Sequence, residues 1–268
     1  MRVPAMRDLR ILVSNDDGIH APGLKAMEAI ARTLSKDVWI VCPDTEQSGA
    51  SHSLTLSDAL RIRPISSRRF AVSGTPTDCV MLAMNTIIKG RRPDLVLSGV
   101  NRGGNLAEDV TYSGTIAAAM EGTLLNVPSI ALSQCYGWVA GKRQVHWDTA
   151  TRHAPALINR LLDTGWPRDC LINVNFPDCR PDDVAGVEVT VQGRRDVNDL
   201  LIDARTDARG NPYYWLGFRH TPFTPPEGTD LAAMRANRIS VTPLHLDLTH
   251  FETRKTLAAA LAAPPTAS

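Results

Sequence analysis

Short apolar runs alternate with amphipathic segments along the first half of the chain. Four compact, mostly apolar runs are typical of buried strands: 11–13, 38–42, 94–100 and 129–132. Three segments between them carry apolar residues at helical spacing: 24–34, 77–88 and 115–125. Strands without polar alternation are covered on both faces, and intervening helices provide the cover. The pattern predicts an α/β fold with a doubly wound, mostly parallel sheet.

The chain changes character in its last hundred residues. Three further strands are expected: 171–176, 184–191 and 239–248. Residues 194–230 are rich in Asp, Arg, Gly and Pro, and only Tyr213–Leu216 resembles a strand. Because this stretch is too long for an ordinary connection, we expect an extended arm or hairpin that packs on another subunit; a mobile surface loop is the alternative. An Ala-rich helix over 251–263, stopped by Pro264 and Pro265, follows.

The length of 268 residues suits one large domain or two small ones. No stretch is rich enough in Gly or Ser to mark a firm boundary. We therefore expect a single domain over 1–268. Its parts are a core at about 9–180, the arm at about 190–232, and a strand and helix at 239–263.

Composition excludes several classes of protein. Hydrophobic residues make up 43% and charged residues 21%, which is ordinary for a globular chain. The 29 Lys and Arg against 28 Asp and Glu leave a net charge of +1, so no strong field is available to hold a nucleic-acid polymer. No run approaches the roughly 20 apolar residues of a membrane span, and no secretory signal opens the chain. We expect a cytoplasmic protein without a nucleic-acid or membrane partner.

The five cysteines are scattered, and no two form a C-x-x-C pair. Their number and spacing argue against a disulfide framework and against a thiolate zinc site. We expect them to be reduced and packed as small apolar groups.

Polar clusters follow predicted strands or open a predicted helix. There are four: Ser14–Gly18, Asp44–Ser53, Ser98–Asn105 and Tyr112–Thr115. Ligands of open parallel sheets bind beyond the carboxyl ends of the strands, so these clusters are expected to converge on one site.

Asp16 and Asp17 stand where the first strand ends. Their carboxylates can meet one ion only if the chain turns there, and Gly18 permits such a turn. An exposed Asp-Gly turn without a ligand is the alternative, and this cluster alone leaves both open. With a Ser and an Asn from the next two clusters, the donors would be hard oxygens, which suit Mg²⁺, Mn²⁺ or Ca²⁺ better than zinc. Either of those two loops could instead be a plain Gly-containing connection.

The fourth cluster lies where the helix over 116–125 begins. Free backbone N–H groups at a helix start, with two hydroxyls beside them, suit an anion such as phosphate. An ordinary Ser or Thr N-cap is the simpler alternative. A cation site and an anion site at the same edge together predict phosphoryl chemistry.

Several motifs of other enzyme classes are missing from the sequence. It lacks the glycine fingerprint of dinucleotide dehydrogenases, the P-loop and the G-x-S-x-G elbow of serine hydrolases. His20 and His52 lack metal-type spacing and are interpreted as loop residues. Asp78 is interpreted as a cap or first-turn acid of a helix.

Six segments form an ordered set of motifs over most of the chain, and only 180–225 matches loosely. The segments are ILVSNDDGIHAPG (11–23), PDTEQSGASHSLTL (43–56), SGTPTDCV (73–80), PDLVLSGVNRGGNLAEDVTYSGTIAAAMEGT (93–123), GTDLAAM (228–234) and ISVTPLHLDLT (239–249). In these segments the chain resembles the stationary-phase survival protein SurE family of 5′-nucleotidases.

The resemblance implies a metal-dependent phosphatase that hydrolyses nucleoside 5′-monophosphates to nucleoside and phosphate. Some members also act on 3′-nucleotides or short polyphosphate. It implies a Rossmann-like core whose C-terminal extension forms dimers or tetramers. One divalent ion per subunit, Mg²⁺ or Mn²⁺, would be held by Asp16, Asp17, Ser48 and Asn101. The phosphate pocket would include Asn15, Asn105, Ser113, Gly114 and Thr115. The chain departs from the family at Thr45–Gln47, where many members have basic residues, and at Arg102–Gly104, so the preferred base and sugar stay open.

The expected reaction is in-line attack of water on a phosphoryl group beside the ion. Asp16 or Asp17 would accept the proton of the water, and the sequence does not choose between them. The helix start at Ser113–Thr115 would stabilise charge on the phosphoryl oxygens. Two alternatives stay open: a non-catalytic nucleotide-binding module, and a Rossmann-like transferase whose metal orients a diphosphate donor.

Overall fold

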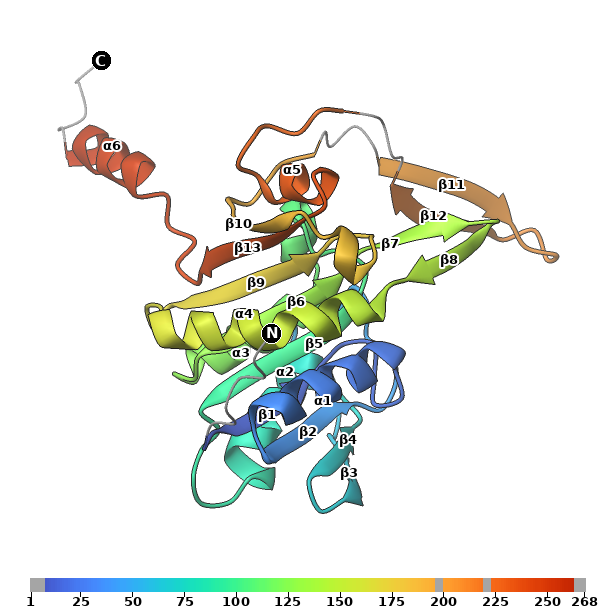
Figure 1. Ribbon diagram of the computed structural model, residues 1–268. Helices are drawn as coiled ribbons and strands as arrows, with labels where there is room; N and C mark the ends of the chain where they lie inside the picture. Colours follow the sequence, from blue (N-terminus) through green and yellow to red (C-terminus); the bar gives the residue numbers. More distant parts are fainter. Residues whose placement is uncertain (1–7, 196–199, 219–222, 263–268) are drawn as a thin grey trace.

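A mostly parallel sheet with helices on both faces forms the centre of the protein, shown in Figure 1 as a computed structural model that describes residues 8–195, 200–218 and 223–262. Its strands run in the order β10-β13-β9-β6-β5-β1-β2-β4-β3. Their bounds are β1 (Arg10–Ser14), β2 (Asp37–Pro43), β3 (Ile62–Ser66), β4 (Arg69–Val72), β5 (Leu95–Arg102), β6 (Ser129–Gln134), β9 (Cys170–Phe176), β10 (Gly186–Val189) and β13 (Arg238–His245).

Helices connect these strands and close the described chain. They are α1 (Pro22–Leu34), α2 (Pro76–Leu82), α3 (Gly114–Leu124), α4 (Trp147–Thr164), α5 (Asp230–Arg235) and α6 (Phe251–Ala262). Shorter turns are a π-helical turn at Ala83–Ile87 and 3₁₀ turns at Ala107–Thr111 and Pro181–Asp183. Two separate hairpins are β7 (Tyr136–Val139) with β8 (Lys142–Val145), and β11 (Leu200–Thr206) with β12 (Pro212–Phe218).

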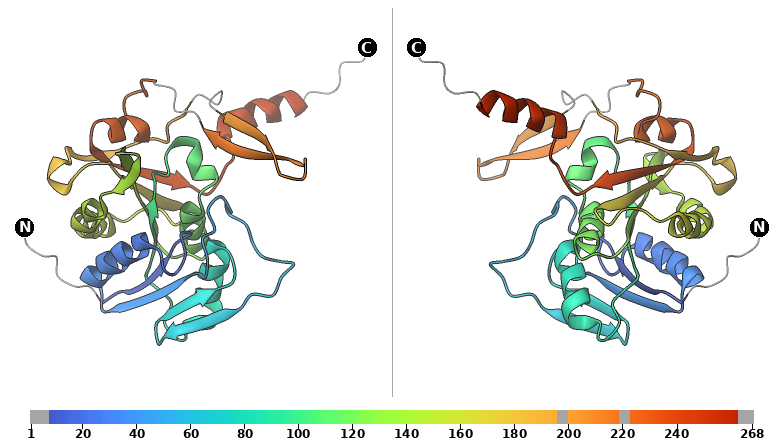
Figure 2. Two further views of the ribbon diagram at one scale, coloured as in Figure 1. Left: turned by 90° about the vertical axis from the view of Figure 1, so that its right-hand side faces the viewer. Right: turned by 90° about the vertical axis from the view of Figure 1, so that its left-hand side faces the viewer.

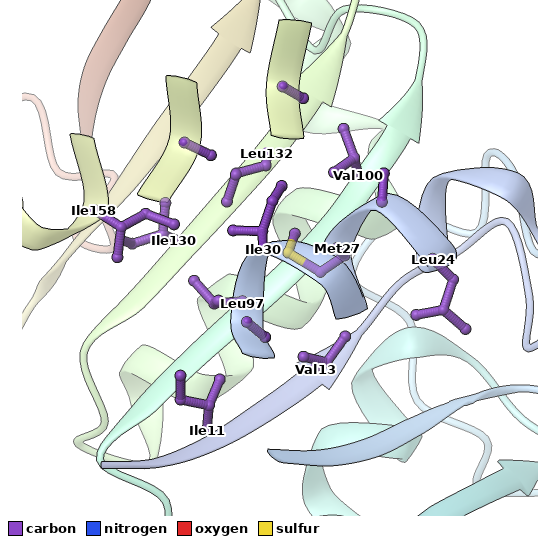
Figure 3. Close-up of a cluster of buried hydrophobic side chains, with 14 of the residues drawn as sticks. Ile11, Val13, Leu24, Met27, Ile30, Leu97, Val100, Ile130, Leu132 and Ile158 are labelled. Carbon is purple, nitrogen blue, oxygen red and sulfur yellow. The ribbon is translucent and has the colours of Figure 1, made fainter. Parts of the chain in front are cut away.

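Two apolar layers lie on opposite faces of the sheet. Helices α1 and α4 cover one face, where Met27 and Ile30 of α1 pack with the inward side chains of β1, β5 and β6 (Figure 3). Helices α2 and α3 cover the other face, where Val80 and Ala118 pack with Leu12 and Val96. Consecutive residues of β1 therefore serve different layers, which explains why its run is continuously apolar.

The start of α2 shows how the sequence fixes a helix boundary. Asp78 accepts a hydrogen bond from the backbone N–H of Thr75 at 2.9 Å, and the Thr75 hydroxyl accepts one from the N–H of Asp78 at 3.2 Å. These reciprocal bonds form a capping box with Pro76 at the first helical position. The interpretation of Asp78 as a first-turn acid is confirmed.

The predicted α/β class is confirmed, and the sheet adds two antiparallel pairs to the parallel core. Strand β13 runs antiparallel to β9, and β3 runs antiparallel to β4. The periodicity did not predict β4, α4, α5 or the β7–β8 hairpin. In α4, Pro155 lies inside the helix and interrupts the local helix signal.

The stretch 194–230 contains the hairpin β11–β12, which agrees with the predicted arm or hairpin; its packing on another subunit stays a prediction. Figures 1 and 2 show this hairpin and α6 projecting from the body of the protein. Every described residue of α6 is exposed. The predicted helix stop at Pro264 and Pro265 lies outside the described residues.

The order of the strands defines the switch point of the sheet. From β1 the chain passes to β2 and then β4 on one side, and it returns to β5, β6 and β9 on the other. Strands β1 and β5 are paired neighbours, so their carboxyl ends flank the point where the winding direction reverses. Open α/β sheets bind ligands at this switch point. The first and third polar clusters meet there.

All five cysteines lie in the described part of the chain, and all are free. Burial is the largest cause of a raised thiol pKa at each of them, and it raises the pKa of Cys135 to about 12. The prediction that they are reduced and packed agrees with this environment, in which four are buried and Cys135 is half-buried. No helix within the described ranges is long and apolar enough to cross a bilayer.

Candidate metal and phosphate site

A cleft of about 570 Å³ opens beyond the carboxyl ends of β1 and β5. Of the nine predicted site residues, six line it: Asp16, Asp17, Ser48, Asn101, Asn105 and Ser113. Asn15, Gly114 and Thr115 do not line it. The remaining lining residues were not predicted: Glu46, Gly49, Arg102, Gly104, Asp109, Tyr112, Arg143 and Leu216.

The turn after β1 brings both carboxylates toward the cleft. Gly18 has φ +94°, a conformation that favours glycine, and a Cβ there would lie 3.2 Å from the backbone carbon of Thr45. The fully buried Asn15 closes the turn, because its Nδ2 donates to the Gly18 carbonyl at 3.0 Å. Asn15 thus shapes the carboxylate turn from below.

Burial makes both carboxylates harder to ionise. It raises the pKa of Asp16 to about 6, opposed by the hydroxyl and backbone N–H of Thr115 and reinforced by the negative charge of Asp17. Burial also raises the pKa of Asp17, opposed by a hydrogen bond from the Arg102 backbone N–H at 3.2 Å. A cation bound between two adjacent buried carboxyl groups would favour their ionised forms and offset the cost of burying two negative charges.

The loop after β2 is tied to the turn after β1. The Gln47 N–H donates to the Asp16 carbonyl at 2.8 Å, and the Ile19 N–H donates to the Pro43 carbonyl at 2.9 Å. Ser48 follows directly and lies exposed at the cleft, where its hydroxyl donates to Glu46 at 2.8 Å. Because its proton is engaged there, the Ser48 oxygen keeps lone pairs for a cation.

Asn101 reaches the cleft through an irregularity of β5. The register between β5 and β6 shifts between Gly99 and Asn101, and such a shift re-aims the following side chains. Asn101 Nδ2 donates to the Gly103 carbonyl at 3.0 Å. This bond fixes the amide and leaves its Oδ1 oxygen for a cation.

The start of α3 packs directly against Asp16. The Thr115 hydroxyl donates to Asp16 Oδ1 at 2.5 Å, and a Cβ on Gly114 would lie 2.7 Å from the Asp16 Cβ. Ser113 is the N-cap, and its oxygen accepts a hydrogen bond from the Ile116 N–H at 3.1 Å. The N-cap interpretation is confirmed, and the Ser113 hydroxyl proton stays available to a ligand in the cleft. Thr115 acts on Asp16 from behind the cleft.

A buried amide network positions Asn105. Asn175 pairs with both backbone groups of Asn105: its Oδ1 accepts from the N–H at 2.8 Å and its Nδ2 donates to the carbonyl at 3.1 Å. Asn173 donates to the same carbonyl at 2.9 Å. Asn105 Nδ2 donates to Ser133 at 2.8 Å, so its second N–H remains for the cleft. Because Asn173 and Asn175 alternate along β9, both face Asn105.

We expect Asn175→Ala to lower the free energy of unfolding by about 2 kcal/mol, because the buried N–H of Asn105 loses its acceptor. Asn173→Ala is the matched control and should cost less, since Asn175 still donates to the Asn105 carbonyl. Urea unfolding of the two variants measures both. Equal losses would contradict a dedicated role of Asn175 in holding Asn105.

Five of the eight additional lining residues lie within the predicted polar clusters, and three do not: Asp109, Arg143 and Leu216. Asp109 lies on the 3₁₀ turn at Ala107–Thr111, and Arg195 pairs with it at 2.7 Å. Leu216 comes from β12 and Arg143 from β8, and both lie outside the four predicted clusters. Only the folded chain brings these segments to the same cleft.

The two histidines near the site are loop residues, as interpreted. His20 is exposed, and His52 Nε2 lies 3.2 Å from Glu121 on α3. Across 8–195, 200–218 and 223–262, no group of three or more His, Cys, Asp and Glu side chains is arranged to hold a metal. The predicted ligand set contains only two carboxylates, together with a hydroxyl and an amide, which is a different kind of donor set.

The family described as Survival protein SurE matches residues 11–199, about seven tenths of the chain. The chain belongs to the SurE family. It is 58% identical over 255 residues to the 5′-nucleotidase SurE of Parvibaculum lavamentivorans, covering 95% of this chain and 92% of that protein. It is 59% identical over 257 residues to the 5′-nucleotidase SurE of Caulobacter vibrioides, covering 96% and 98%.

The fold is similar to that in the crystal structure of the SurE protein from Aquifex aeolicus. The two superpose with a TM-score of 0.82 at 38% identity, covering 94% of this chain and 99% of that one. The motifs quoted from the sequence therefore belong to a SurE fold, and the cleft at its switch point contains six of the nine residues that the resemblance named.

Proposed function

We propose that this SurE protein hydrolyses nucleoside 5′-monophosphates to nucleoside and phosphate, with one divalent ion per chain. The observation that carries the proposal is the convergence of Asp16, Asp17, Ser48 and Asn101 in one cleft with Ser113 at the start of α3. The named relatives are 5′-nucleotidases that resemble this chain over nearly its whole length.

The residues fit a hard divalent ion. All four donors offer oxygen, and the geometry leaves Asn101 Oδ1 and the Ser48 oxygen available. The raised pKa values of Asp16 and Asp17 reflect the free-energy cost of ionising buried carboxyl groups. A bound cation would offset this cost. Mg²⁺ or Mn²⁺ bound by these donors supplies charge to polarise a phosphoryl oxygen and to acidify a water.

Side chains of the cleft would bind the phosphoryl group and accept the proton of the water. Ser113 donates its free hydroxyl proton to a phosphoryl oxygen, and Asn105, which lines the same cleft, offers its second N–H. Asp17, less buried than Asp16 and not engaged with Thr115, accepts the proton of the attacking water. Thr115 keeps Asp16 ionised and oriented.

Phosphate release from a panel of nucleoside 5′- and 3′-monophosphates tests the reaction class. We expect release from 5′-nucleotides with Mg²⁺ or Mn²⁺ and none with EDTA, because the donor set holds the charge that the reaction needs. Tight binding of AMP without any release would instead support a non-catalytic nucleotide-binding module. Tight binding of nucleotide sugars with little hydrolysis would support a transferase.

Self-association forms a separate part of the proposal. The hairpin β11–β12 exposes several large apolar side chains, among them Ile202, Tyr214 and Trp215, and Trp215 is 61% exposed. Together with the exposed α6, this surface suits contact with a second copy of the chain, as a dimer or tetramer.

Light scattering at micromolar concentration is expected to give at least twice the monomer mass of 29.2 kDa. Trp215→Ser should shift the equilibrium toward monomer, because it removes a large exposed apolar surface. Arg209→Ala, at the tip of the same hairpin, is the control and should leave the mass unchanged. A monomer at all concentrations would contradict this part of the proposal.

A further inference from the structure

The hairpin β7–β8 has an aromatic and cationic face, from which Arg143 lines the cleft. Trp138 on β7 pairs in register with Arg143 on β8, and Tyr136 pairs with Val145. Alternate residues of a strand share a face, so Tyr136, Trp138 and Arg143 lie on the same side of the hairpin. Figure 1 shows the hairpin projecting at the end of the sheet toward which β9 points.

Arg143 is held over two rings. Its guanidinium carbon lies 4.4 Å from the ring centre of Tyr136 and 5.5 Å from that of Trp138. The two rings meet edge to face, with centres 6.3 Å apart. Contact with aromatic rings restricts a guanidinium group, and Arg143 is at the same time exposed.

The same face contacts the loop that carries Asn101 and reaches the cleft through Arg143. A Cβ on Gly103 would lie 3.4 Å from Tyr136 Cε1, so this ring packs beside the loop that carries Asn101. Arg143 lines the cleft together with Asp16, Asn101 and Ser113.

Arg143 has no carboxylate partner among the described residues, although four acidic side chains line the same cleft: Asp16, Asp17, Glu46 and Asp109. Arg102, by contrast, lies 4.0 Å from Glu46. Trp138 is 64% exposed, and Leu216 adds an apolar side chain at the border of the cleft. A planar cation without an ion pair, beside exposed aromatic and apolar groups, suits a flat aromatic ligand.

We propose that the face of Tyr136, Trp138 and Arg143 is the nucleobase subsite of the cleft. The base stacks on the exposed guanidinium of Arg143, which its contacts with Tyr136 and Trp138 hold in place. Stacking uses the π-face that every base has, and the larger purines gain more than pyrimidines. The assignment rests on the proposed nucleotidase function for its substrate, and on the hairpin geometry for its location.

Two substrates that differ only in the base provide the test. Arg143→Ala is expected to lower kcat/KM for AMP about tenfold through KM, which is within the range for losing one stacking contact. Ribose 5-phosphate, which has no base, should be hydrolysed by this variant as by the wild type. Arg143→Lys keeps the charge and loses the plane, so it should resemble Arg143→Ala with AMP.

Lys142→Ala is the matched control, because Lys142 is the neighbouring cation on the opposite face of the same strand. It should leave both substrates unchanged. An equal loss with AMP and ribose 5-phosphate, or full rescue by Arg143→Lys, would show that Arg143 binds the phosphate through its charge. Unchanged AMP kinetics in Arg143→Ala would place the base elsewhere. Each of these results overturns the assignment.

Calorimetric titration with adenosine separates this inference from the proposed function. Wild type is expected to bind adenosine, and Arg143→Ala to bind it about tenfold more weakly. A wild type that binds adenosine in this way but hydrolyses no monophosphate would refute the nucleotidase and support the base subsite. Equal adenosine affinity of wild type and Arg143→Ala would refute the base subsite, whatever the activity.

Discussion

Asp17→Asn is expected to reduce phosphate release from AMP about 1,000-fold, the loss corresponding to ~4 kcal/mol of transition-state stabilisation. The substitution removes one of the two adjacent charges that would hold the ion, and it removes the group that accepts the proton of the water. It keeps the shape of the side chain. An asparagine Oδ1 can still accept the 3.2 Å hydrogen bond from the Arg102 backbone N–H, so the fold should persist.

Asp44→Asn is the control for charge. Asp44 is an exposed carboxylate directly after β2, and it pairs with Arg63. It does not line the cleft that contains Asp16 and Asp17. Its loss should leave phosphate release within about twofold of wild type, because an exposed ion pair contributes little. Circular dichroism confirms that both variants are folded. Full activity of a folded Asp17→Asn protein would exclude Asp17 from the chemistry.

Gly23→Ala is expected to lower the free energy of unfolding by about 3 kcal/mol. Alanine ordinarily stabilises a helix relative to glycine by about 1 kcal/mol. Here a Cβ would lie 1.9 Å from the backbone oxygen of Val100 and 3.0 Å from the Trp147 ring, so α1 must move away from β5. The cost of this displacement exceeds the gain in helix propensity.

Gly217→Ala is the control for the stability measurement. Its Cβ would meet no atom within 4 Å, and no positive φ is present at this position. Urea unfolding should therefore give a change within about 0.5 kcal/mol for Gly217→Ala. A Gly23→Ala protein as stable as wild type would show that α1 approaches β5 less closely than the structure has it.

The parallel core could be predicted because each of its buried strands is a local apolar run. Leu12, Val41 and Val96 belong to strands covered on both faces, which gives a signal within a few residues. Strand β4 and the β7–β8 hairpin are short and contain exposed or charged residues such as Arg69 and Lys142, so the same signal is missing.

Some residues of the site could likewise be predicted from the sequence, and others could not. Asp16 and Asp17 follow β1 directly and Ser48 lies in the loop after β2, so the order of the strands brings them to one edge. The inward role of Thr115 depends on how α3 packs against the turn after β1, and that contact joins residues 99 positions apart. Arg143 and Leu216 reach the cleft from hairpins whose placement depends on tertiary packing.

We propose that phosphomonoester hydrolysis requires one divalent ion held at the cleft beyond β1 and β5. Titration of the metal-free protein with Mn²⁺, with bound Mn²⁺ and phosphate release from AMP followed in the same samples, tests it most directly. We expect both to rise together and saturate at one Mn²⁺ per chain, and Asp17→Asn to lose both. Phosphate release that persists in EDTA would contradict a required ion. Mn²⁺ binding by Asp17→Asn that equals that of the wild type would contradict its placement at this cleft.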